Sequence, residues 1–247
     1  MTDRARFDRA RYTVLGETYG KEGIGVLAER SLHRILKLYL EEREEYHEVK
    51  LMGSVADIMN GEEIYEIQTR ALTKLKPKLE KFLSQYPVTV VYPLVYDKYL
   101  RWIDKETGKI SERRKSPKRS TVYDAFWELY NIREYLSNPN LSVKLIFLNV
   151  EEFKYREAKA FGRTRRSVRA ESIPISIERE IDLVRADDYR IFIPEGLPEA
   201  FSAADFNRAV GKSFRYGYSG IQILRSVGLV SEGERVGRKI IYTLIKD

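Results

Sequence analysis

The sequence predicts an α/β fold in which helices alternate with the strands of a mixed sheet, followed by a small C-terminal module. Apolar residues recur at three- and four-residue spacing over 25–40, which is typical of an amphipathic helix that covers a sheet. Near-continuous apolar runs at 88–95 and 141–150 are typical of central strands covered on both faces. The alternation of these patterns favours helices flanking one sheet.

The elements of the predicted core follow in order along the chain. The helix at 25–40 comes first, and a short strand at 48–52 follows it. A hairpin is expected at 53–69, because an Asn-Gly pair at Asn60 and Gly61 between apolar runs strongly favours a tight turn. The rest of the core is expected to comprise a helix at 72–86, a strand at 88–95, a hairpin at 99–111, a helix at 122–136 and a strand at 141–150.

The hairpin at 53–69 carries acids that an ordinary pair of strands does not need. Its first strand is expected to end at Asp57. In the second strand, expected from Glu63 to Thr69, one face presents Ile64, Glu66, Gln68 and then Arg70, because successive side chains alternate. Both faces contain apolar residues, so both are expected to be partly buried. A buried carboxylate is costly unless it is paired or holds a metal, and the hairpin is therefore expected to bind something.

This order of elements, with acids at these points, resembles the PD-(D/E)xK nuclease superfamily, which includes restriction enzymes and Holliday junction resolvases. The resemblance covers about residues 20–155. The family has a Glu on the first helix, an Asp at the end of one strand and an E-x-K on the next. Glu29, Asp57 and the run from Glu66 to Gln68 stand in those places, with Gln68 replacing the lysine. The resemblance implies a restriction-endonuclease-like core that hydrolyses phosphodiester bonds in DNA.

Metal-dependent hydrolysis gives these side chains a chemical role. Mg²⁺ takes oxygen ligands, commonly one or two carboxylates plus waters, so Asp57 and Glu66 are expected to hold Mg²⁺ or Mn²⁺. Glu29 is expected to bind a second ion or to orient a metal-bound water. Gln68 can orient the attacking water, but it cannot supply the positive charge of the family's lysine. Arg70 could partly replace that charge, if the strand extends so far.

Each of these residues also has a purely structural interpretation. Glu29 can be a solvated acid at the edge of its helix, and Asp57 can cap a turn. Glu66 and Gln68 can lie on a solvent face. The sequence therefore fits two functions: a metal-dependent DNA endonuclease, and a nuclease-fold DNA-binding or regulatory protein whose catalysis has decayed. An adaptor that binds only proteins is a third, more distant interpretation.

The C-terminal segment 193–247 is expected to form a separate domain after a nuclease-like domain at 1–192. A connector rich in proline and glycine, 193–201, precedes two helices and a basic hairpin, which together resemble a winged helix. Ser202, followed three residues later by Asp205, predicts the start of the first of these helices. The whole chain resembles uncharacterised bacterial proteins that join this nuclease core to a winged helix. The module is expected to bind DNA; a homodimer contact or a protein partner is the alternative.

The charge of the chain favours a polyanionic partner. Forty-four Lys and Arg against 37 Asp and Glu give a net charge of +7, which suits nucleic acid. A cationic loop at 161–174 and a second basic stretch at 112–119 are expected to contact phosphate. The residues expected to contact DNA, from the hairpin, the loop and the wing, are Arg70, Arg163, Arg165, Arg166, Arg169, Arg238 and Lys239.

Other classes of protein are excluded by composition. The chain has no cysteine, which removes disulfide frameworks, thiol catalysis and cysteine-ligated zinc. Its first residues lack the apolar core of a secretory signal, and it contains no apolar run of about 18 residues that could span a bilayer. The chain is therefore expected to be cytoplasmic, without a membrane partner.

Overall fold

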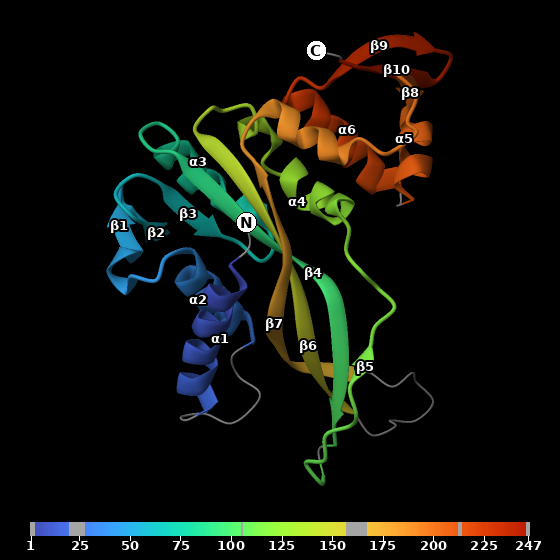
Figure 1. The fold of residues 1–247 in the computed structure, drawn as a ribbon. Helices are drawn as coiled ribbons and strands as arrows, with labels where there is room; N and C mark the ends of the chain where they lie inside the picture. The colour runs from blue at the N-terminus through green and yellow to red at the C-terminus, as the bar shows by residue number, and fades with distance from the viewer. Residues whose placement is uncertain (1–2, 20–27, 105, 157–166, 212–213, 246–247) are drawn as a thin grey trace. The chain divides into compact units, whose positions relative to one another are not determined.

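A computed structural model of the chain describes residues 3–19, 28–104, 106–156, 167–211 and 214–245 (Figure 1). Only the backbone is described at 17–19, 28–30, 156, 167–171 and 214–215. The protein has a mixed α/β fold, as the sequence predicts, with one large mixed sheet, helices beside it and a small second sheet near the C-terminus. None of the helices in these ranges combines the length and apolar content that crossing a membrane requires.

The chain divides into two compact units, and each unit is assembled from three separate segments. Three strands contribute residues to both units: β4 (Val88–Ile103), β6 (Leu141–Arg156) and β7 (Ser167–Leu183). The first unit contains Met1–His47, Pro93–Ser120 and Ile146–Glu180, and the second contains Glu48–Tyr92, Thr121–Leu145 and Ile181–Asp247.

Two helices begin the first unit. Helix α2 (Ala28–Leu40) confirms the predicted helix, whose first three positions lie outside the described residues. Helix α1 (Arg4–Tyr19) was not predicted. The two helices contact each other through Phe7 and Tyr39, whose rings meet edge to face at 5.7 Å.

The large sheet is mixed, in the order β1-β2-β3-β4-β6-β7, with β5 paired to β4. Strands β2 and β3 are antiparallel, whereas β3 and β4 are parallel. The predicted hairpin is confirmed: Gly61 has a φ of 98°, and the side chain of Asn60 accepts a hydrogen bond from the backbone N–H of Glu63. The strands are β1 (His47–Leu51), β2 (Ser54–Met59), β3 (Ile64–Ile67), β4 (Val88–Ile103), β5 (Arg114–Lys115), β6 (Leu141–Arg156) and β7 (Ser167–Leu183).

Three predicted boundaries in the sheet are wrong. Strand β2 continues past Asp57 to Met59, so Asp57 lies inside the strand and not at its end. Strand β3 ends at Ile67, and Arg70 therefore does not continue its face. Strand β7 includes Arg169, which was assigned to a loop. Strand β7 is the last in the sheet order, and an edge strand tolerates the proline at position 174 that argues against a central strand.

The predicted helices at 72–86 and 122–136 are each broken into shorter pieces. Helix α3 (Lys76–Phe82) has Pro77 in its first turn, where a missing N–H does no harm, and a 3₁₀ turn precedes it. Helix α4 (Phe126–Tyr130) lies between two further 3₁₀ turns. Both α3 and α4 belong to the second unit.

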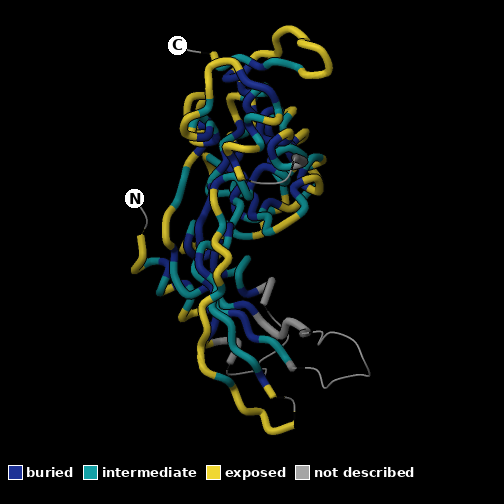
Figure 2. Tube along the Cα trace, turned by 90° about the vertical axis from the view of Figure 1, so that its right-hand side faces the viewer, coloured by how far each residue is buried: buried dark blue, intermediate teal, exposed yellow. Residues whose placement is uncertain are grey.

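The C-terminal module contains the two predicted helices and the predicted hairpin. Ser202 caps the first helix, because its side chain accepts a hydrogen bond from the backbone N–H of Asp205. The order of the small antiparallel sheet is β8-β10-β9. The hairpin is exposed over 231–239, which is seen in Figure 2 near the C-terminus. The elements are β8 (Ala200–Ser202), α5 (Ala203–Val210), α6 (Phe214–Ser226), β9 (Val230–Val236) and β10 (Lys239–Leu244).

This module shares a core with α4. The buried ring of Phe126 lies 5.2 Å from the ring of Phe192 and 6.3 Å from that of Phe206. Gly220 of α6 lies against the same ring: a Cβ at this position would come closer than 3.0 Å to three carbons of Phe126. The absence of a side chain at Gly220 therefore lets α6 approach α4 closely.

Candidate functional site

Asp57 and Glu66 lie on the neighbouring strands β2 and β3. The strands pair Ile58 with Tyr65, and the same register brings Asp57 opposite Glu66. At this point Oδ2 of Asp57 accepts a hydrogen bond from the backbone N–H of Ile67 at 2.8 Å. The Asp57 carboxylate is therefore held on the backbone of β3, next to Glu66.

Glu66 is almost completely buried, with 1% of its surface exposed. The Nζ atom of Lys78, from α3, lies 2.7 Å from its Oε2 atom. The other oxygen, Oε1, is also buried, and within the described part of the chain it has no hydrogen-bond partner. The pKa of Glu66 is raised to about 7: burial raises it most and the nearby charge of Asp57 adds to this, while Lys78 acts in the opposite direction.

These two carboxylates fit a hard divalent cation. Lys78 already balances the charge of Glu66, but among the described residues the Oε1 atom of that carboxylate lacks the partner that buried polar atoms normally have, and a bound cation would satisfy it. Mg²⁺ and Mn²⁺ take carboxylate oxygens, and Mg²⁺ keeps several waters. In the described ranges no group of three or more His, Asp or Glu side chains is placed to hold a metal. Asp57 and Glu66 are thus the residues that would hold the ion.

Glu29 is the second residue of α2, in the first unit of the chain. Its backbone is helical, as predicted, but its side chain lies outside the described residues. A role for Glu29 at a second ion or at a metal-bound water stays a prediction.

Gln68 follows the end of β3, and its side chain binds the backbone two residues further along the sequence. Its backbone N–H still donates to the carbonyl of Val91 at 3.0 Å, but its Nε2 atom donates to the carbonyl oxygen of Arg70 at 2.5 Å. Ala71 follows with a φ of 56°, which ends the extended conformation. The predicted strand face through Arg70 is wrong, because β3 ends at Ile67 and the chain bends at Thr69 and Arg70.

Lys78 is the residue of this site that the sequence does not reveal. Leu79 and Phe82 of α3 are fully buried, which fixes the helix and holds Lys78 beside Glu66. Lys76 and Lys81 flank it in the sequence, and nothing in the linear pattern distinguishes among the three lysines. Only the packing of α3 shows which of the three lysines lies beside Glu66.

The basic stretch at 112–119 is largely engaged within the first unit. Lys115 and Arg119 both bind Asp97, at 2.7 and 2.9 Å, and Arg119 is the main cause of the lowered pKa of that carboxyl. Arg113 lies 3.5 Å from Glu151. These cations already neutralise acids of the protein, so less of their charge is available to phosphate than the sequence suggests.

The other predicted DNA contacts fall in two places. Arg163, Arg165 and Arg166 lie outside the described residues, as does the side chain of Arg169. Arg238 and Lys239 are exposed at the turn between β9 and β10, where the sequence places them.

Comparison with known proteins gives two matches. The model of a family described as a domain of unknown function, DUF8091, matches residues 30–184, which is more than half of the chain. An uncharacterized protein of Treponema pallidum (strain Nichols) is 28% identical over 221 residues, covering 89% of this chain and 86% of that protein. No solved structure is significantly similar to the chain. The family match includes Asp57, Glu66 and Lys78.

Proposed function

This chain belongs to the DUF8091 family, and we propose that it is a metal-dependent DNA endonuclease with a restriction-endonuclease-like core and a winged-helix accessory module. The observation that carries the proposal is the pair of neighbouring carboxylates, Asp57 and Glu66. One oxygen of Glu66 is buried without a partner, which suits a bound Mg²⁺ or Mn²⁺. Such an ion would activate a water and neutralise charge on the phosphate.

The side chains of the protein have distinct roles in this proposal. Asp57 is oriented by the N–H of Ile67, so its carboxylate is preorganised to receive a cation. Lys78 supplies a fixed positive charge beside the site, where Gln68 cannot. The pairing of Lys78 with Oε2 leaves Oε1 of Glu66 for the ion.

The choice of DNA as substrate is supported by charge and by the C-terminal module. The net charge of +7 favours a polyanion, and Arg238 and Lys239 are exposed, so they would contact a phosphate backbone in this proposal. The order of two helices and a hairpin resembles a winged helix, whose second helix, α6, would approach DNA from Tyr218 to Ser226.

The test uses the purified full-length chain with Mg²⁺ or Mn²⁺ and linear, single-stranded and branched DNA. Asp57→Asn and Glu66→Gln should each lower cleavage by at least about a hundredfold, because they remove charge but little volume. The affinity of each variant for DNA should equal or exceed that of the wild type. Glu62→Gln is the matched control, because Glu62 is an exposed acid of the same hairpin. If the wild-type chain cuts none of these substrates and calorimetry detects no bound metal, the enzyme proposal fails.

A decayed nuclease that binds or regulates DNA is the second candidate. It is favoured by Gln68, which lacks the charge of the family's lysine and donates to the carbonyl of Arg70. Salt-dependent DNA binding without cleavage would identify this case. Binding of neither DNA nor metal would favour the module as a contact for a second copy or a protein partner.

A further inference from the structure

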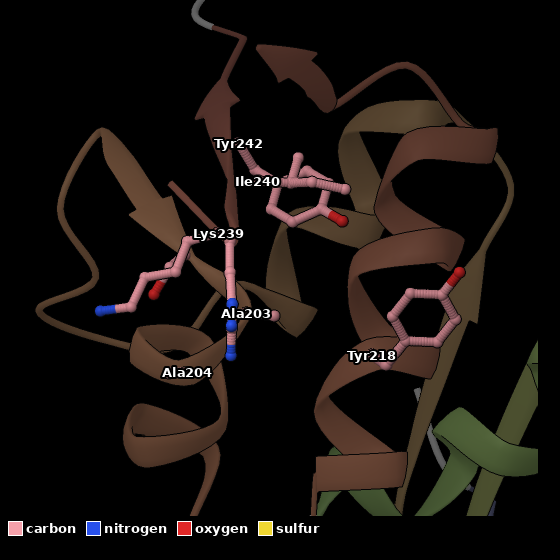
Figure 3. Close-up of a pocket in the computed structure, with 8 residues that line it drawn as sticks. Ala203, Ala204, Tyr218, Lys239, Ile240 and Tyr242 are labelled. Atoms are coloured by element: carbon pink, nitrogen blue, oxygen red, sulfur yellow. The ribbon is translucent and has the colours of Figure 1, made fainter. Parts of the chain in front are cut away.

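The C-terminal module contains a pocket of about 280 Å³ that the proposed nuclease chemistry does not use. It lies among the start of α5, helix α6 and strand β10 (Figure 3). Small residues at the start of α5, among them Ala204, form part of its lining. The rest of the lining is two aromatic rings, one aliphatic side chain and two cations: Tyr218, Tyr242, Ile240, Arg238 and Lys239.

The two tyrosines differ in their freedom to meet a ligand. Tyr242 is 3% exposed, and its ring lies 5.9 Å from that of Phe201, so it is part of the module's core. Tyr218 is 40% exposed, with its ring 6.4 Å from that of Tyr130. One side of the pocket therefore presents an aromatic ring that is held by a neighbour and still open to solvent.

The two cations of the pocket are not neutralised by any residue that the structure describes. Arg238 and Lys239 are exposed, and in the described residues neither forms an ion pair. By contrast, Glu232 of the same hairpin binds Arg225 at 2.8 Å. Positive charge thus accumulates at the rim of a pocket whose interior is aromatic and aliphatic.

We propose that this pocket binds one unpaired nucleotide of a DNA strand, at a single-stranded end or a branch point. The base would stack on the ring of Tyr218, and the backbone phosphates of the nucleotide would contact Arg238 and Lys239. A base offers an aromatic face and a phosphate offers negative charge, which are the two features that this lining complements. The volume lies just below the usual range for ligand pockets, about 300–1,000 Å³, so it suits a ligand no larger than one nucleotide.

This inference rests on the proposed function, because it names the structure of the DNA that the enzyme would select. Every base has an aromatic face, so the pocket should recognise an unpaired nucleotide with little preference for its sequence. Selection of strand ends or branches would follow from the pocket, while cleavage would follow from Asp57 and Glu66.

The experiment measures binding of the full-length chain by fluorescence anisotropy in EDTA, so that cleavage does not interfere. Two labelled duplexes with the same number of phosphates are compared, one blunt and one with a three-nucleotide overhang. Wild type should bind the overhang about tenfold more tightly. Tyr218→Ala should abolish this preference, and Tyr218→Phe should keep it. Tyr12→Ala, at an exposed tyrosine of α1, should change nothing.

A second variant keeps the test valid if Tyr218→Ala does not fold. Ala204 is exposed at the start of α5, so Ala204→Trp can fill the pocket without disturbing the core, and it should also abolish the preference. The pocket inference is overturned if wild type binds both duplexes equally, or if the preference for the overhang survives both variants. Either result leaves the nuclease proposal standing. Competition by poly-glutamate as effective as that by single-stranded DNA also overturns it. Binding of neither duplex removes DNA as the substrate and fails both proposals.

Discussion

The ammonium group of Lys78 lies 2.7 Å from Oε2 of Glu66, and it is the cation that balances this buried carboxylate. Lys78→Ala should lower the free energy of unfolding by about 1–3 kcal/mol at pH 8, because it leaves a buried charge without its partner. The side chain of Lys78 is 29% exposed, which keeps the loss below that of a fully buried pair.

At pH 5 the loss should be much smaller, because Glu66 is then protonated in the folded chain. Urea denaturation at both pH values measures the difference. Lys81→Ala is the control on the same helix, since Lys81 bonds the hydroxyl of Ser54 at an exposed position, away from the buried carboxylate of Glu66. An equal loss at pH 5 and pH 8 would show that Lys78 stabilises the fold by packing alone.

Gln68→Lys tests whether Lys78 supplies the charge that the family's lysine would provide. In the wild-type background the change should raise cleavage less than about threefold, because one cation is already present. In a Lys78→Ala background it should restore part of the lost activity. Single-turnover cleavage rates of the four proteins form a double-mutant cycle. Additive effects on the rate would mean that positions 68 and 78 do not act on the same charge.

Glu66→Gln should change how stability depends on pH in the metal-free protein. The pKa of Glu66 rises from 4.5 to about 7 on folding, so the folded chain holds the proton more tightly than the unfolded chain. The free energy of unfolding should therefore fall by up to ~3 kcal/mol as pH rises from 4.5 to 7, and then level off.

The Glu66→Gln protein should lack this decline and be more stable than wild type at pH 8. Denaturant titrations in EDTA at pH 5 and pH 8 give the comparison, with Glu62→Gln as the exposed control. A wild-type protein whose stability does not fall over this range, relative to Glu66→Gln, would contradict a buried, proton-binding Glu66.

Gly220→Ala tests the contact between α6 and α4. Its new methyl group would meet the ring of Phe126, which is itself enclosed by Phe192 and Phe206. Overpacking of this kind should cost about 1–3 kcal/mol, measured as a lower denaturant midpoint. Gly16→Ala in α1 is the matched control: nothing lies within 4 Å of the added carbon, so it should stabilise the helix by up to ~1 kcal/mol.

The hairpin that carries the candidate site is predictable from the sequence because its signals are local. Asn60 bonds the N–H of Glu63 three residues later, and Gly61 adopts the positive φ that the turn needs. The cap of α5 is predictable for the same reason, since Ser202 and Asp205 are near neighbours. Interactions within one turn of chain leave a recognisable pattern.

The missed elements depend on contacts between distant residues. The buried residues of α1 include Phe7, Ala10 and Val14, a sparse stripe among charges that is stabilised by contact with α2. The strand β7 carries Pro174, which argues against a strand until its place at the sheet edge is known. Lys78 and Glu66 are twelve residues apart and meet only because α3 packs beside β3.

The interleaving of the two units has a consequence for synthesis of the chain. Phe126 leaves the ribosome long before Phe192 and Phe206, the rings that enclose it. Its apolar surface must therefore stay exposed while about eighty further residues are made, which is a period of aggregation risk for a nascent chain. Because both units draw on three segments, neither can be expressed from one uninterrupted stretch of the gene. A fragment that ends before Phe206 would lack part of the core that encloses Phe126.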